Sequence, residues 1–302
     1  MSKFPALPGR AKTHWPVPFN SVTKADGDIL MRTLFVSDLD GTLMRSDKTI
    51  SDYSAGVINR LIEQGVLFTY ATARSIQSAM EITGALKLSL PAVTRNGTVL
   101  ADNSSGRMIK KAVFSAEEVG LIKDRLTELP RCGFVSCYVG DEMIKVYHGG
   151  SLSAGMEEYV LEHKDDPRMK RVESTGEMFS GEAGYITLID EKEKLQDAYE
   201  RMKEYPGWEC VFGKDAYSDL FWLEICPECC TKATALLKLK KKAGADRLVV
   251  FGDSVNDIPM FRIADEAYAV KNADDTLKQI ATAVIGSNDD DAVARFLEQA
   301  AL

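Results

Sequence analysis

The sequence has no excess of basic residues. Its 302 residues include 37 lysines and arginines but 45 aspartates and glutamates, which gives a formal net charge of −8 at pH 7. Sequence-independent binding to nucleic acid requires a basic surface that neutralises backbone phosphates. The basic cluster at residues 238–242 is typical of a solvated helix end. We therefore expect no nucleic-acid partner.

Long apolar runs are also missing. No stretch reaches the roughly 18 apolar residues that a membrane-spanning helix needs, so we expect no membrane partner. The first thirty residues contain four prolines with interspersed charge and lack the apolar centre of a signal peptide. We expect residues 1–30 to form a loosely ordered N-terminal extension.

Cysteine and histidine are scarce, which limits the metal sites that the chain can build. There are six cysteines and three histidines. Cys226, Cys229 and Cys230 look like half of a zinc site, but no second cysteine pair or nearby histidine completes four ligands. Reduced thiols in a cytoplasmic protein are the favoured interpretation, and a zinc-binding module is the alternative.

The order of strands and helices indicates an α/β fold with two domains. Apolar strands alternate with amphipathic helices over residues 31–97 and 226–302, a pattern typical of a Rossmann-like core with a parallel sheet. Residues 98–225 contain shorter strands, turns and two helical segments, which indicates an inserted α+β domain. A chain of 302 residues is long enough for both.

The strongest chemical signal is the motif DLDGT, residues 38–42, which follows the apolar strand Thr33–Ser37. Side chains two apart in a strand lie on the same side, and open α/β sheets bind ligands at the carboxyl ends of their strands. Asp38 and Asp40 would repel each other there, and a divalent cation would relieve the repulsion. One carboxylate could then act as nucleophile while the other transfers protons. For this pentapeptide alone, an ordinary Asp-Gly turn is the alternative.

A second acidic loop, GDSVND, covers residues 252–257 and also follows an apolar strand. A third carboxylate from a parallel neighbouring strand would complete a set of hard oxygen ligands for Mg²⁺. An Asx-rich turn that leads into a helix is the alternative for this loop alone. The two loops together favour a metal site that includes Asp38 and Asp253.

Two further residues occupy positions suited to binding phosphate. Thr72 ends the strand over residues 66–71 and opens a helix, where its hydroxyl and the following amides can meet an anion. Lys232 begins a helix although the helix macrodipole favours acids there, which suggests a role in neutralising negative charge. A plain N-cap threonine and a solvated lysine are the alternatives.

Together these segments resemble the haloacid dehalogenase superfamily over nearly the whole chain after residue 30. DLDGT resembles its first motif, YATAR (70–74) its second, TKATAL (231–236) its third and GDSVND its fourth. About 160 residues separate the second and third motifs, which is similar to the Cof-type branch with a C2B cap domain. RNGTVL (95–100) resembles the NGA segment of that branch.

The resemblance implies an enzyme, a phosphoric monoester hydrolase that uses Mg²⁺ to hydrolyse a small phosphorylated metabolite. It implies Asp38 as the nucleophile that forms an aspartyl-phosphate and Asp40 as the group that donates and accepts protons. Mg²⁺ would be held by the Asp38 carboxylate, the Asp40 backbone carbonyl and Asp253, with Asp257 supporting the metal or the lysine. The residues implied in phosphate binding are Leu39, Thr72, Ala73, Lys232 and Asn256. Ala73 replaces the glycine that is usual in the second motif.

Two other functions on the same scaffold are the alternatives. A phosphomutase acting on a hexose phosphate would need a cap that binds a second phosphate, and the sequence does not assign Arg131, Lys145 or Arg168 to that task. A non-catalytic sugar-phosphate sensor should have lost the nucleophile or the general acid, but Asp38 and Asp40 are both present.

The inserted domain is expected to act as a lid. It would close over the substrate and exclude water, with hinges near residues 98 and 225. Its aromatic residues Tyr138, Tyr147, Tyr217 and Trp222 are expected in the interior of the cap rather than at the substrate.

Overall fold

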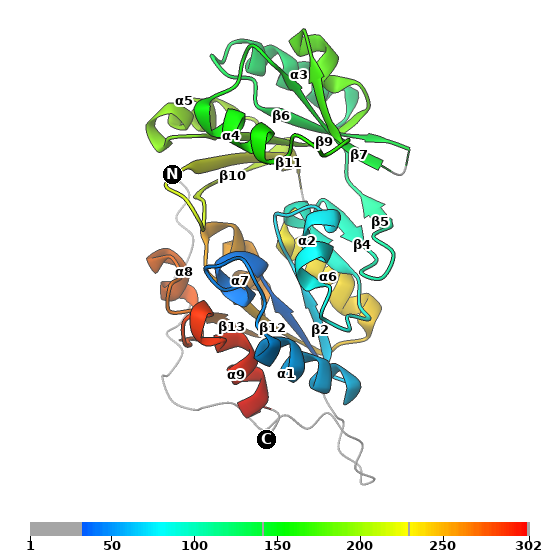
Figure 1. Cartoon of the computed structure of the whole chain (residues 1–302), viewed down its shortest axis with the longest axis vertical. Helices are drawn as coiled ribbons and strands as arrows, with labels where there is room; N and C mark the ends of the chain where they lie inside the picture. Colours follow the sequence, from blue (N-terminus) through cyan, green and yellow to red (C-terminus); the bar gives the residue numbers. More distant parts are fainter. Residues whose placement is uncertain (1–31, 141, 229, 301–302) are drawn as a thin grey trace.

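The computed structural model describes residues 32–140, 142–228 and 230–300 and contains two domains, each built around its own large β-sheet (Figure 1). The lower domain in Figure 1, the core, contains a five-stranded sheet, and the upper domain, the cap, contains a six-stranded sheet. The chain returns from the cap to the core between β11 (Phe221–Pro227) and α6 (Lys232–Ala243). The predicted extension at residues 1–30 lies outside the described residues.

The core sheet is parallel throughout, in the order β14-β13-β12-β1-β2. Its strands are β1 (Thr33–Ser37), β2 (Leu67–Tyr70), β12 (Arg247–Gly252), β13 (Glu266–Ala269) and β14 (Ala283–Val284). Side chains alternate along β1, so that Phe35 packs into one hydrophobic cluster and Leu34 and Val36 into the other. Both faces of the strand are buried, which explains its uninterrupted apolar sequence.

Helices cover both faces of the core sheet. One face carries α1 (Asp52–Glu63), α2 (Ile76–Thr83) and α9 (Ala292–Ala300), and the other carries α6, α7 (Ile258–Ile263) and α8 (Asp275–Ile280). The hydroxyls of Ser51 and Ser75 accept hydrogen bonds from backbone amides three residues on, which caps the start of α1 and α2. The predicted α/β core with a parallel sheet is confirmed.

The cap sheet has the order β10-β11-β9-β6-β7-β8 and is antiparallel except for the β7–β8 pair. Its other strands are β6 (Phe134–Val139), β7 (Glu142–His148), β8 (Met169–Val172), β9 (Glu182–Asp190) and β10 (Trp208–Lys214). The helices α3 (Ala116–Thr127) and α5 (Lys192–Met202) pack on the face that carries Val135 and Cys137. A third helix, α4 (Ala154–Glu162), packs on the opposite face against Phe134 and Ile189 and was not predicted from the sequence.

A small antiparallel sheet lies where the two domains meet. It consists of β3 (Ala92–Thr94), β4 (Val99–Ala101) and β5 (Met108–Lys111). β4 and β5 fall within the predicted cap, but β4 pairs with β3 and β5 pairs with β4. The domain boundaries at residues 98 and 225 stay predictions. Gly97, in the turn before β4, has φ 102°, and a Cβ built there would lie 2.2 Å from the Thr231 carbonyl oxygen. The turn therefore packs directly against the start of α6.

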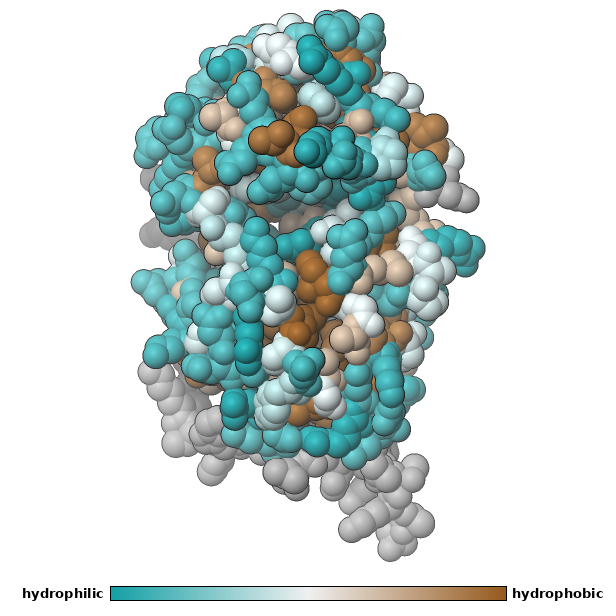
Figure 2. All heavy atoms as spheres, in the orientation of Figure 1, coloured by the Kyte–Doolittle hydropathy of each residue, from teal (hydrophilic) through white to brown (hydrophobic). Residues whose placement is uncertain are grey.

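The surface in Figure 2 is hydrophilic over most of both domains, with hydrophobic side chains in limited patches. The exposed large hydrophobic residues come from separate elements: Tyr53, Ile109, Val113, Val139, Leu161, Leu237, Ile280 and Val284. Single exposed residues of this kind are ordinary in water-soluble folds. Within the described ranges, no helix combines the length and hydrophobicity needed to cross a membrane.

We expect Gly97→Ala to lower the free energy of unfolding by about 2 kcal/mol or more, because it combines a left-handed φ with a clash against backbone. The matched control is Gly56→Ala in α1, where no atom lies within 4 Å of an added Cβ. That change should raise the free energy of unfolding by about 0.5–1 kcal/mol. Urea unfolding measures both, and equal effects would contradict the tight packing at Gly97.

Candidate active site

The carboxyl ends of neighbouring core strands bring the predicted residues to one edge of the sheet. Asp38 follows β1, Asp253 follows β12 and Thr72 lies just after β2. Because β1 pairs in parallel with both other strands, the three ends lie side by side. The Asp38 amide extends this pairing by donating to the Phe251 carbonyl at 2.9 Å.

A cluster of carboxylates forms at this edge. Asp38, Asp253 and Asp257 each place an oxygen within 4.8 Å of the others. The Lys232 ammonium donates to Asp38 Oδ1 at 2.6 Å and to Asp257 Oδ1 at 2.7 Å. Lys232 is only 1 % exposed and Asp257 is fully buried, so one buried ammonium faces three carboxylates.

Burial makes this negative charge costly. It raises the pKa of Asp38 to about 8, with Lys232 opposing the rise and Asp257 and Asp40 adding to it. Burial also raises the pKa of Asp253 well above its ordinary value, and the charges of Asp38 and Asp257 reinforce this. A cation bound between Asp38 and Asp253 would favour their charged forms, and carboxylate oxygens are ligands that Mg²⁺ prefers.

The loop that carries Asp253 is held in place by short-range contacts. Asp257 Oδ2 accepts hydrogen bonds from the amides of Asp253 and Ser254 at 3.0 and 3.2 Å. The Thr42 hydroxyl donates to Asp253 Oδ1 at 3.0 Å. Gly41 has φ 69°, and a Cβ there would lie 2.4 Å from Asp253 Oδ2. Only glycine at position 41 lets the first motif approach the fourth this closely.

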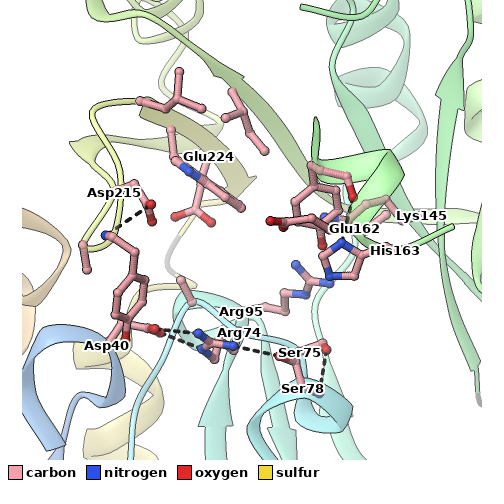
Figure 3. A pocket seen from close by; sticks show the side chains of 18 of the residues that line it. Asp40, Arg74, Ser75, Ser78, Arg95, Lys145, Glu162, His163, Asp215 and Glu224 are labelled. Carbon is pink, nitrogen blue, oxygen red and sulfur yellow. Dashed lines mark hydrogen bonds and ion pairs between the residues drawn. The ribbon is translucent and has the colours of Figure 1, made fainter. Parts of the chain in front are cut away.

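Asp40 pairs with Arg74 at the wall of the site (Figure 3). Arg74 donates to both Asp40 oxygens, from Nε at 2.8 Å and from Nη2 at 2.7 Å, and its Nη1 donates to Ser78 at 3.0 Å. Such a two-pronged pair fixes the carboxylate in orientation as well as in charge. The sequence analysis did not predict this role for Arg74. The available signal was its position two residues after Thr72, in the same loop.

A cavity of about 1310 Å³ lies between the core and the cap, and Figure 2 shows the surface hollowed between them. Asp38, Asp40 and Asp253 line it from the core. Tyr217 and Trp222 line it from the cap, so the expectation that they belong to the cap interior was wrong for these two. Of the three cap cations that the sequence did not assign to a second phosphate, Lys145 and Arg168 line the cavity, whereas Arg131 is an exposed residue outside it.

Comparison with known proteins identifies the family of this chain. Residues 35–297 match the family of haloacid dehalogenase-like hydrolases. This chain belongs to that family. The match confirms the resemblance drawn from the four motifs, including the Cof-type branch.

Relatives of this hydrolase include named phosphatases. 5-amino-6-(5-phospho-D-ribitylamino)uracil phosphatase YwtE of Bacillus subtilis is 27 % identical over 285 residues, covering 87 % of this chain and 96 % of its own. Pyridoxal phosphate phosphatase YbhA of Escherichia coli is 28 % identical over 271 residues, covering 86 % and 95 %. These names and the family support the predicted enzyme class, a phosphoric monoester hydrolase.

Solved structures share the fold. A haloacid dehalogenase-like hydrolase from B. subtilis has a TM-score of 0.71 at 22 % identity, covering 89 % of this chain and 99 % of its own. BT1666 from Bacteroides thetaiotaomicron, a phosphatase of the same superfamily, has a TM-score of 0.72 at 18 % identity, covering 93 % and 98 %. At these identities the similarity supports the fold alone.

Asn96 connects the fourth motif of the hydrolase to the cap. Asn256 donates to Asn96 Oδ1 at 3.3 Å, and Asn96 Nδ2 lies 2.8 Å from Glu224 Oε2 and 2.7 Å from the Tyr185 hydroxyl oxygen. Asn96 has φ 50°, a left-handed conformation that asparagine adopts more readily than most residues. The RNG segment was recognised from the sequence only as a family likeness, and this contact was not predicted.

The remaining predicted residues lie at or behind the cavity wall. Ala73 and Asn256 line the cavity. Thr72 is fully buried, and its hydroxyl accepts a hydrogen bond from the Arg74 amide at 3.1 Å, which leaves the hydroxyl hydrogen available. The Leu39 side chain packs in the hydrophobic core, so only its backbone can face a ligand.

The cysteine cluster gives no second metal site among the residues that are described. There, Asp38, Asp253 and Asp257 are the only group of three potential metal-ligating side chains. Cys226 is buried, and its thiol lies 3.5 Å from the Cys230 carbonyl oxygen. Cys229 lies outside the described residues, so the zinc alternative stays a prediction.

We expect Lys232→Met to lower the free energy of unfolding by about 3–5 kcal/mol, because the carboxylate cluster loses the ammonium that neutralises it. The control is Lys242→Met, an exposed lysine in the same helix, which should change the stability by less than about 0.5 kcal/mol. Urea unfolding without divalent ions measures both. If both variants unfolded at the same urea concentration, Lys232 would not be needed to neutralise the carboxylate cluster.

Proposed function

We propose that this hydrolase is a Mg²⁺-dependent phosphatase that transfers the phosphoryl group of a small phosphorylated metabolite to Asp38 and then to water. The observation that carries the proposal is the carboxylate cluster around Lys232 at the wall of the cavity. Phosphoryl transfer depends on positioning and on neutralising the oxygens of the moving group, and such a cluster suits both tasks. The names of two relatives, phosphatases of small phosphorylated molecules, support the substrate class.

Asp38 is the nucleophile in this mechanism. Its Oδ1 is bound to Lys232, while Oδ2 has no hydrogen-bond partner among the residues that the structure describes. Oδ2 attacks the phosphorus, the bond from phosphorus to the leaving oxygen breaks, and an aspartyl-phosphate forms. Water then attacks this phosphorus and releases inorganic phosphate and the free carboxylate.

Asp40 acts as the general acid and then as the general base. It donates a proton to the leaving oxygen in the first step and accepts one from the attacking water in the second. Both of its oxygens accept hydrogen bonds from Arg74 in the structure, which fixes the orientation of the carboxyl group at the cavity wall. Arg74 is therefore a positioning residue for the proton transfer.

Mg²⁺ would be held by the carboxylates of Asp38 and Asp253 and by the backbone carbonyl of Asp40. When bound, it would neutralise the carboxylates and the oxygens of the phosphoryl group. Asp257 is close enough to be a ligand, but its two oxygens are already occupied by Lys232 and by two loop amides. It is therefore better suited to supporting Lys232 and the loop.

Lys232 and the residues around the second motif would bind the phosphoryl oxygens. The free hydroxyl hydrogen of Thr72 can donate to one of them. The proposed contacts are Lys232, Thr72, the backbone at Leu39 and Ala73, and Asn256. Together they supply hydrogen bonds at the place where charge is transferred.

We expect Asp38→Asn to lower the Mg²⁺-dependent release of phosphate from 4-nitrophenyl phosphate at least about a thousandfold, because the nucleophile is lost. The control is Asp124→Asn, an exposed aspartate of α3, which should keep kcat within about twofold. Circular dichroism would check that both variants fold. Turnover of Asp38→Asn at the rate of the control would contradict the mechanism.

We expect Mg²⁺ at about a hundred times its Kd to raise the free energy of unfolding by about 2–3 kcal/mol, because the ion binds the folded site only. Asp253→Asn should remove most of this increase, since one charged ligand is lost. Thermal unfolding with and without Mg²⁺, with Asp124→Asn as control, measures the effect. An undiminished Mg²⁺ effect in Asp253→Asn would rule out this residue as a ligand.

A phosphomutase is the second candidate, because Lys145 and Arg168 line the cavity. Arg168 is already paired with Asp166 at 2.6 Å, which leaves Lys145 as the more available of the two. Activation by a sugar bisphosphate would favour the mutase. Steady release of inorganic phosphate without one favours the phosphatase.

A further inference from the structure

The face of the cap sheet that lines the cavity carries buried polar residues. Ser136 in β6 lies directly opposite Lys145 in β7, so the two side chains share this face. Ser136 is 1 % exposed and Lys145 is 6 % exposed, and both line the cavity. A sheet face buried in this way normally carries apolar side chains, as it does at Phe134 beneath α4.

Arg95 adds a second buried cation from the core side. It precedes Asn96 in the turn after β3, is 9 % exposed and lines the same cavity. Figure 3 shows Arg95 reaching toward the side of the cavity where Lys145 lies. In the described part of the chain, Arg95 Nε and Ser136 Oγ are buried with no hydrogen-bond partner. We call Arg95, Ser136 and Lys145 the basic wall.

The basic wall has more positive charge than its neighbours neutralise. Lys145 donates a hydrogen bond to the Tyr159 hydroxyl at 3.0 Å, and its ammonium lies 4.1 Å from the centre of the Tyr159 ring and 5.0 Å from that of Phe134. These partners carry no full negative charge. Glu224 is the buried carboxylate nearby, and it is engaged with Asn96 and Tyr185. Burial lowers the pKa of Lys145, and the charge of Arg95 lowers it further. Two buried cations thus face one carboxylate.

Other acidic residues line the cavity but do not cancel this charge. Five of them are exposed, so that water and salt screen them: Glu81, Glu142, Glu158, Glu162 and Asp165. Asp215 is half-buried, and its Oδ2 accepts hydrogen bonds from the Tyr217 amide at 3.3 Å and the Ser218 hydroxyl at 2.9 Å. Asp166 is nearer the interior but is paired with Arg168 at 2.6 Å. The uncompensated charge of the basic wall therefore faces the cavity.

We propose that the basic wall binds a second anionic group of the substrate, a carboxylate or another phosphate, at the end opposite the reacting phosphate. The proposal rests on the proposed phosphatase function. Asp38 and the basic wall line one cavity of about 1310 Å³, so a single ligand can contact both. An anionic group would give Arg95 Nε and Ser136 Oγ the hydrogen-bond partners that they lack and would give Lys145 a charged partner. Phosphate esters with an uncharged far end would leave Arg95 Nε and Ser136 Oγ buried without a hydrogen-bond partner.

Two matched substrate pairs test the proposal and distinguish the sources of the anion. We would measure kcat/KM of the wild-type enzyme with Mg²⁺ for 6-phosphogluconate against glucose 6-phosphate, and for fructose 1,6-bisphosphate against fructose 6-phosphate. We expect the acidic member of at least one pair to be preferred about tenfold or more. Preference in the first pair identifies a carboxylate, and preference in the second identifies a phosphate. No preference in either pair would overturn the proposal.

Variants then locate the preference. Lys145→Met should lower the ratio of kcat/KM within the preferred pair about ten- to a hundredfold, and Ser136→Ala about two- to tenfold. The control is Lys214→Met, an exposed lysine that also lines the cavity and is paired with Asp219 at 2.8 Å. It should leave the ratio within about twofold. An equal loss in the control would show that general charge, and not the basic wall, sets the preference.

Binding separates this proposal from the phosphatase function. Calorimetry of 6-phosphogluconate and fructose 1,6-bisphosphate with Asp38→Asn, alone and combined with Lys145→Met or Ser136→Ala, requires no turnover. We expect the added substitution to weaken binding of the preferred compound at least about twofold for Ser136→Ala and tenfold for Lys145→Met. Unchanged affinity in the Ser136→Ala and Lys145→Met combinations would overturn the basic wall even in an active enzyme. An inactive wild type that still shows these losses would instead refute the phosphatase function alone.

Discussion

The structure depends on one ammonium group buried among carboxylates. Lys232 contacts Asp38 after one strand and Asp257 after another, and it can do so only because α6 begins at this edge of the sheet. A parallel sheet places the necessary strand ends side by side, and helices on both faces exclude water from them. Burial strengthens the interaction and also makes the unneutralised charge costly. The same constraint therefore links the fold of the core with its chemistry.

A second constraint joins the core to the cap. Asn96 bridges Asn256 of the loop after β12 and Glu224 of the cap sheet, and the neighbouring Arg95 faces the cavity. One short turn thus contacts the reacting end and the distant end of the proposed substrate site. If the cap moved, the hydrogen bonds of Asn96 to Glu224 and Tyr185 would pull on this turn. Hydrogen bonds between buried groups are stronger than those in water.

Local sequence predicted the core well and the cavity poorly. The strand Thr33–Ser37 has the predicted bounds and a helix begins at Lys232 as predicted, because apolar periodicity and caps are local properties. Arg74 could not be assigned from spacing, since its partner Asp40 is distant in sequence. The pairing of Ser136 with Lys145 depends on the register between two strands, which no motif encodes. Helix α4 was missed for a related reason, because its few buried residues give only a weak apolar pattern.

The contact of Gly97 with Thr231 has a consequence for how such a chain can diversify. The obstacle to a side chain at position 97 is a peptide carbonyl, so no exchange of a neighbouring side chain can make room for it. Ser136 and Lys145 of the cap differ from this position, because their side chains line the cavity. Selection for a new metabolite can therefore change cavity-lining residues of the cap while position 97 remains glycine.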